Sequence, residues 1–277
     1  MSGLVFMACS GAAIAAFVAA VNWKKIAALF DDRSVESKDT AVLCVGMGVS
    51  KCAGKCPGAD LDADRMHNVL KGYASGGITL LHGQKATYSA VMGAFREAVK
   101  HDLCIFYYSG HGGRDERDGK NRSGEEDMRD EYLCPYDRFI KDDEVWSVVQ
   151  GAKGRVVLIF DCCHSGTMYR ALDRDDPSFS MFTGAHPFTL RRFAKRAPEG
   201  ATALREPNLL CWSAARENEY SYGGDDGGIF TNALLVSYDR KRTYSDVWDG
   251  IEKRMKGEPN RPVRTRFGEG FGGKVFK

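Results

Sequence analysis

The chain has almost no net charge, because 39 Lys and Arg residues face 37 Asp and Glu residues, for a formal charge of +2. A domain that binds nucleic acid usually concentrates basic residues, so this balance gives no reason to expect a nucleic-acid partner. No internal repeat is visible either. A hydrophobic content of 43% and a charged content of 27% are ordinary for a globular protein, and 277 residues suffice for one large domain or two modest ones.

Two ligand motifs are present only in part. Gly46 and Gly48 resemble the start of a dinucleotide-binding turn, but the third glycine of that fingerprint would fall at Lys51, and no acidic residue ends the next apolar run. Cys52 and Cys56 lack a second pair of ligands at a suitable spacing, so a zinc site is not expected. A dinucleotide-binding domain is therefore only a remote alternative.

The nine cysteines are odd in number and scattered along the chain. Several lie inside apolar runs, where a free cysteine behaves as a small buried hydrophobic residue. This usage is typical of an intracellular, reducing compartment, and disulfides are not expected.

The N-terminal segment contains no charged residue from 2 to 22, and Trp23, Lys24 and Lys25 follow it directly. This length just suffices to cross a hydrocarbon core of roughly 30 Å, and the lysines would lie on the cytoplasmic side. Residues 3–21 are thus a candidate membrane anchor, with a core-packed helix as the alternative. No basic residue precedes the apolar run, which disfavours a cleaved signal peptide. We expect this segment and a linker over 1–37, followed by one domain over 38–277.

Apolar runs and amphipathic stretches alternate from residue 41 onward. Strands are predicted over 41–45, 78–81, 103–108, 156–160 and 208–212, and helices over 62–73, 88–100, 142–150, 229–238 and 244–255. This alternation predicts an α/β fold with a mostly parallel sheet between helical layers. The polar stretches 114–131 and 171–207 are predicted to be solvated loops.

Reactive side chains follow two of the predicted strands. Cys163 comes shortly after the run 156–160, and His111 lies in a Ser-Gly-His-Gly-Gly turn after the run 103–108. Ligands gather at the carboxyl ends of parallel strands, and a thiol beside an imidazole is what a cysteine nucleophile and its base require.

At these two sites the chain resembles the metacaspases, which are relatives of the caspases. The residues that carry the resemblance are Y-Y-S-G-H-G at 107–112 and D-C-C-H-S-G at 161–166. Weaker matches are G-A-D-L-D-A at 58–63, D-E-Y-L-C-P-Y-D at 130–137, C-W-S-A-A at 211–215 and G-I-F-T at 228–231. Together they span about residues 38–270.

The resemblance implies a caspase-like three-layer sandwich and a cysteine endopeptidase that acts as a monomer. Its large-subunit region would cover about 38–172, a connecting loop 173–207, and the small-subunit region 208–277. Cys163 would be the nucleophile, His111 the general base or acid, and the backbone N–H groups of Gly112 and Cys163 the oxyanion hole. A catalytically silent caspase-like scaffold is the main alternative.

The resemblance also implies cleavage after Arg or Lys, because Asp62 and Asp161 occupy the positions of an acidic specificity pocket. The simpler interpretation of Asp62 is a residue in the first turn of a helix. Calcium stimulation is implied through Asp130, Asp142 and Asp143, although a fourth family aspartate falls at Arg170, with Asp173 nearby. Basic pairs within 190–206 (Arg191-Arg192 and Lys195-Arg196) would be self-cleavage sites.

Overall fold

A computed structural model describes residues 37–114, 131–163, 207–215 and 221–277, with the backbone alone for Arg114 and Cys163. In the described part of the chain, no helix combines the length and the apolar composition needed to span a membrane. The candidate anchor at 3–21 lies outside that part, as do the basic pairs within 190–206. The predicted domain boundaries therefore stay predictions.

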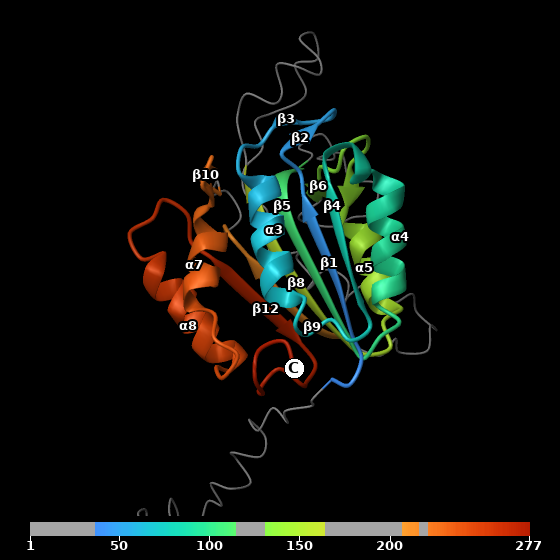
Figure 1. Cartoon of the computed structure of the whole chain (residues 1–277), viewed down its shortest axis with the longest axis vertical. Coiled ribbons are helices and arrows are strands. Elements are labelled where there is room, and N and C mark those ends of the chain that lie inside the picture. The colour runs from blue at the N-terminus through green and yellow to red at the C-terminus, as the bar shows by residue number, and fades with distance from the viewer. Residues whose placement is uncertain (1–36, 115–130, 164–206, 216–220) are drawn as a thin grey trace, which may run out of the picture.

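The core of the molecule is a sheet with the strand order β12-β9-β8-β5-β1-β4 (Figure 1). All neighbours along this path are parallel except β12 and β9. Continuous apolar runs form the central strands because both of their faces are covered. The strands are β1 (Thr40–Gly46), β4 (Gly77–His82), β5 (Leu103–Arg114), β8 (Arg155–Cys163), β9 (Asn208–Ser213) and β12 (Val263–Phe267).

Helices cover both faces of this sheet. On one face lie α3 (Ala59–Leu70), α7 (Ile229–Ser237) and α8 (Tyr244–Arg254), and on the other lie α4 (Tyr88–Ala98) and α5 (Asp142–Gln150). Alternate residues of each strand join opposite cores: Phe106 packs with the α4 and α5 side chains, and Tyr107 packs with those of α3 and α7. The predicted three-layer α/β sandwich with a mostly parallel sheet is confirmed.

Several boundaries differ from those predicted. The helix expected from residue 62 begins at Ala59, because Gly58 adopts a left-handed conformation (φ 81°) that lets the chain turn directly into α3. Strand β5 continues well past residue 108 and pairs there with a short strand, β6 (Glu131–Leu133). The edge strand β12 was not predicted, and its five residues pair antiparallel with β9.

Short hairpins surround the carboxyl ends of the parallel strands. They are formed by β2 (Val49–Ser50) with β3 (Gly54–Lys55), by β6 with β7 (Ile140–Lys141), and by β10 (Gly223–Gly224) with β11 (Gly227–Gly228). A 3-10 turn, η1 (Gly83–Lys85), follows β4. These hairpins place backbone groups around the strand ends, where the sequence predicts chemistry.

Candidate active site

The backbones of His111 and Cys163 lie side by side on neighbouring strands. β5 and β8 are parallel, and His111 is the register partner of Cys163. The two residues that carry the predicted catalytic roles therefore meet at one edge of the sheet. The catalytic assignment of the Cys163 thiol stays a prediction, because its side chain is not described.

The imidazole of His111 is held by a backbone carbonyl. Its Nε2 lies 2.8 Å from the carbonyl oxygen of Lys55, at the end of β3. A carbonyl only accepts hydrogen bonds, so Nε2 carries a proton, and in the neutral ring Nδ1 is left as the nitrogen that can accept one. The β2–β3 hairpin thus selects the tautomer that a general base needs.

The Tyr108 hydroxyl holds the turn that carries His111 in place through two hydrogen bonds. The Tyr108 hydroxyl donates to the His111 carbonyl at 2.7 Å and accepts from the backbone N–H of Cys134 at 3.1 Å. Gly110 lies between them, where a Cβ would come within 2.8 Å of the Met47 Cβ, so this position requires glycine. Tyr108 and Lys55 are positioning residues that the sequence did not single out.

Cys162 is buried in the core on the α4 and α5 side of the sheet. Burial, followed by the charge of Asp161, raises the pKa of its thiol well above the ordinary value. A thiol of this kind is a packing residue rather than a nucleophile, as expected from its position before Cys163. The predicted oxyanion donors, Gly112 and Cys163, are not tested by any described contact.

The two predicted substrate-binding acids, Asp62 and Asp161, approach each other on the α3 and α7 face. Strand alternation directs Asp161 to the same face as Ile159, and Asp62 lies in the first turn of α3. Both side chains are buried, with 1% of Asp62 and none of Asp161 exposed. β11 lies between them: a Cβ on Gly227 would come within 2.0 Å of Asp62 Oδ1, and one on Gly228 within 2.0 Å of Asp161 Oδ2.

Asp161 has donors on both of its oxygens. Oδ1 accepts from the Ser221 hydroxyl at 2.8 Å, and Oδ2 accepts from the backbone N–H and the hydroxyl of Thr231 at 2.9 and 2.7 Å. The Thr231 hydroxyl also lies 2.6 Å from the Tyr107 hydroxyl. Burial raises the pKa of Asp161 and these hydrogen bonds oppose the rise.

Only one carboxylate oxygen of Asp62 accepts hydrogen bonds from the described residues. Oδ2 accepts from the Ser109 hydroxyl at 2.9 Å and from the backbone N–H of Gly228 at 2.8 Å. Oδ1 is buried and has no hydrogen-bond partner among the described residues. Burial, with the nearby charge of Asp161, raises the pKa of Asp62 to about 7. The nearby charge of Arg65 opposes this rise, but Oδ1 still lacks a hydrogen-bond donor among the described residues.

The predicted calcium ligands are only partly described. Asp142 and Asp143 begin α5, where Asp142 is buried and its Oδ1 accepts from the backbone N–H of Asp143 at 3.0 Å. Asp130, Arg170 and Asp173 lie outside the described residues. The described residues contain no cluster of three His, Cys, Asp or Glu side chains that could hold a metal ion. The carboxylates of Asp142 and Asp143 are nevertheless oxygen ligands of the kind that calcium prefers.

A mostly parallel sheet between two helical layers, with a cysteine and a histidine at adjacent strand ends, defines a caspase-like α/β domain. A family model described as "Caspase domain" matches residues 41–267, and the chain belongs to this family of cysteine peptidase domains. The protein is similar to Metacaspase-1 of Pyricularia oryzae (41% identity over 209 residues; 58% of this chain and 51% of that protein). It is also similar to Metacaspase-1 of Cryptococcus neoformans (32% over 223 residues; 70% and 42%).

The chain thus spans about half the length of these curated relatives. Two solved structures share its fold. Protein GSU0716 of Geobacter sulfurreducens superposes with a TM-score of 0.63 at 23% identity, over 86% of this chain and 98% of that one. Caspase-1 of Spodoptera frugiperda superposes with a TM-score of 0.52 at 12% identity, over 84% and 88% of the two chains. At these identities the likeness supports the fold alone.

Proposed function

We propose that the protein is a cysteine endopeptidase of the metacaspase type that cleaves peptide bonds after Arg or Lys. The observation that carries the specificity is the buried Asp62 Oδ1, which has no hydrogen-bond partner among the described residues and lies near a second buried carboxylate. A guanidinium or ammonium group would supply the missing donor and offset the charge of both aspartates.

The chemistry follows from the register of His111 and Cys163. His111 Nδ1 removes the thiol proton, and the Cys163 thiolate attacks the carbonyl carbon on the carboxyl side of the Arg or Lys residue. The backbone N–H groups of Gly112 and Cys163 stabilise the oxyanion. The imidazolium then donates its proton to the leaving amine, and water releases the acyl group from the thiol.

The direct test uses fluorogenic peptides that end in Arg, Lys, Gln or Asp before the scissile bond. The wild-type chain is expected to hydrolyse the Arg and Lys peptides, whereas Cys163→Ala is expected to be inert. Cys162→Ala is the matched control and is expected to retain activity, because Cys162 only packs in the core. Activity of Cys163→Ala, or inertness of the wild type toward all four peptides, would refute the proposal, and the second outcome would favour a scaffold.

We also propose that calcium stimulates the enzyme through Asp130, Asp142 and Asp143. Calcium is expected to raise the melting temperature of the wild-type chain but not that of Asp142→Asn combined with Asp143→Asn. Asparagine keeps the Oδ1 acceptor that caps the start of α5, so the variant isolates the carboxylate charge. Asp249→Asn, on the exposed surface of α8, is the control. Equal melting temperatures in calcium and in chelator would contradict this part.

Self-cleavage after the basic pairs within 190–206 is the remaining part of the proposal. Mass spectrometry of the purified wild-type chain is expected to find new C-termini at Arg192 or Arg196, and the Cys163→Ala protein should stay intact. Cleavage at the same positions in both proteins would indicate a contaminating protease.

A further inference from the structure

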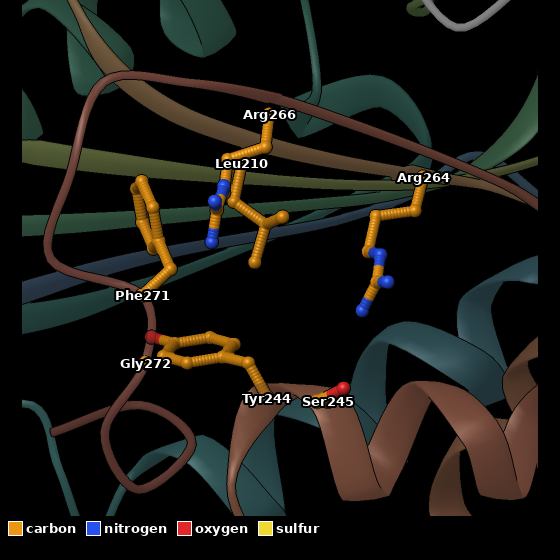
Figure 2. Close-up of a pocket in the computed structure, with 7 residues that line it drawn as sticks. All are labelled: Leu210, Tyr244, Ser245, Arg264, Arg266, Phe271 and Gly272. Atoms are coloured by element: carbon orange, nitrogen blue, oxygen red, sulfur yellow. The ribbon is translucent and has the colours of Figure 1, made fainter. Parts of the chain in front are cut away.

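A pocket of about 420 Å³ lies between the edge of the sheet and α8, away from the strand ends that carry His111. Its lining comes from β9, β12, the first turn of α8 and the segment after β12 (Figure 2). A volume of this size is within the range of small-molecule sites. The lining residues are Leu210, Tyr244, Ser245, Arg264, Arg266, Phe271 and Gly272.

At this pocket, the side chains on one face of the sheet change from apolar to basic. Arg264 and Arg266 of β12 are the register partners of Trp212 and Leu210 in β9, so all four side chains lie on the same face. Trp212 and Leu210 are buried in the core beneath α3, α7 and α8. On the neighbouring strand β12, the same face of the sheet carries the guanidinium groups of Arg264 and Arg266.

Arg264 contributes a positive charge to the lining of the pocket. Its guanidinium lies 5.5 Å from the centre of the Trp248 ring, and in the described part of the chain it makes no ion pair with a carboxylate. Asp246, in the next position along α8 from Ser245, binds the backbone N–H and hydroxyl of Thr243 at 3.0 and 2.8 Å. That carboxylate is therefore already engaged at the cap of the helix.

The remaining walls supply a hydroxyl and two aromatic rings. The Ser245 hydroxyl and the Arg264 guanidinium point toward the same opening in Figure 2. Ser245 lies in the first turn of α8, the end of the helix at which the helix dipole favours a negative charge. The rings of Tyr244 and Phe271 meet edge to face at 5.8 Å between centroids and form an apolar part of the wall.

We propose that this pocket binds a small organic anion, in which a phosphate or carboxylate group contacts Arg264 and Ser245 and an aromatic or apolar part contacts Tyr244 and Phe271. Guanidinium groups bind both kinds of oxyanion in a bidentate geometry. The pocket would be a second binding site, and the proposal does not depend on the peptidase activity.

Isothermal titration calorimetry on the full chain at constant ionic strength tests the proposal. Phenyl phosphate and benzoate present the two anionic groups on one ring, inorganic phosphate presents the anion alone, and phenol presents the ring alone. Saturable binding is expected for phenyl phosphate or benzoate, and the tighter of the two identifies the anionic group. Weaker binding is expected for inorganic phosphate, and none for phenol. Absence of saturable binding by both ring-bearing anions would overturn the proposal and leave the arginines a role in keeping the sheet edge unpaired.

Variants separate the pocket from general charge attraction. Arg264→Gln is expected to weaken binding about tenfold or more, as the loss of a charge-assisted hydrogen bond implies. Lys253→Gln removes one positive charge from the same helix, about 12 Å from Ser245 along its axis, and is expected to leave the affinity unchanged. Ser245→Ala should weaken binding a few-fold, and it provides the test if Arg264→Gln does not fold. Equal weakening by Lys253→Gln and Arg264→Gln would overturn the proposal.

Discussion

Asp62 places a titration near neutral pH inside the candidate specificity pocket. Its pKa is raised to about 7 in the folded protein, chiefly by burial, from an ordinary value of 3.8. Between these two values the folded protein keeps a proton on Asp62 that the unfolded chain releases. The free energy of unfolding therefore falls as the pH rises through this window, and the full penalty is present above about pH 7.

Replacing Asp62 with asparagine is expected to stabilise the protein at pH 8, on the order of 2 kcal/mol, because it removes a buried charge. The gain should shrink as the pH falls through this window and be mostly lost near pH 4, where the carboxyl is protonated in the folded state and about half protonated in the unfolded state. Urea unfolding at the two pH values measures this difference.

The same variant should lose most of its activity on Arg peptides, because the partner of the cation is gone. For the wild type, kcat/KM on these peptides should rise as the pH rises through 7.

The control for this variant is Asp249→Asn, which removes an exposed carboxylate from α8. Its stability relative to the wild type should change little between pH 4 and pH 8. A stabilisation of Asp62→Asn that is equal at both pH values would show that the pKa of Asp62 is not raised.

For individual residues, the sequence predicted the side chains of the site better than the groups that contact them. His111, Asp62 and Asp161 stand in recognisable motifs, so their positions follow from the resemblance. The carbonyl of Lys55 carries no side-chain signature, since every residue has the same carbonyl. The role of Gly227 and Gly228 beside the two carboxylates was not predicted either, because a glycine pair in a polar stretch predicts only a turn. The contact of these glycines with both carboxylates depends on packing between elements far apart in the sequence.

The beginning of α8 depends on a capping box. Thr243 Oγ1 accepts from the backbone N–H of Asp246 at 3.1 Å, and Asp246 Oδ2 accepts from the backbone N–H of Thr243 at 3.0 Å. Thr243→Ala is expected to lower the free energy of unfolding by about 1 kcal/mol, because the first turn loses a hydrogen-bond acceptor. Thr243→Ser keeps the hydroxyl and should unfold at nearly the wild-type urea concentration. If serine and alanine cost the same, the loss would come from the Thr243 methyl group rather than from the cap.

Elements with a long, regular apolar pattern were predicted well. The central strands are continuous apolar runs, and α5 covers the predicted residues 142–150 without change. β12 was missed because only Val263, Thr265 and Phe267 alternate with its two arginines, and such a short pattern does not reveal an antiparallel partner. The hairpins β2–β3 and β10–β11 have two-residue strands, which are too short for any periodicity.

Across the whole molecule, one buried arginine joins the two ends of the described domain. Arg155 begins β8, and its guanidinium donates to the carbonyl of Gly270, to the Ser37 hydroxyl at 2.9 Å and to the carbonyl of Lys277 at 2.8 Å. In Figure 1 the C-terminus accordingly lies beside the start of β1, at the end of the sheet remote from the hairpins. A single side chain thus ties the segment before β1 and the segment after β12 to a central strand.

Arg155→Met is expected to lower the free energy of unfolding by about 3 kcal/mol, because the buried carbonyl of Gly270 and the partly buried carbonyl of Lys277 each lose a donor while the hydrophobic stem is kept. Arg155→Lys has fewer donors, so its free energy of unfolding should lie between those of Arg155→Met and the wild type. Lys153→Met, two residues earlier and exposed, is the control. Asp161 lies six positions after Arg155 along the strand, or about 20 Å, so kcat/KM of the folded variant should equal that of the wild type. Wild-type stability in Arg155→Met, measured by urea unfolding, would show that the C-terminal segment docks without this residue.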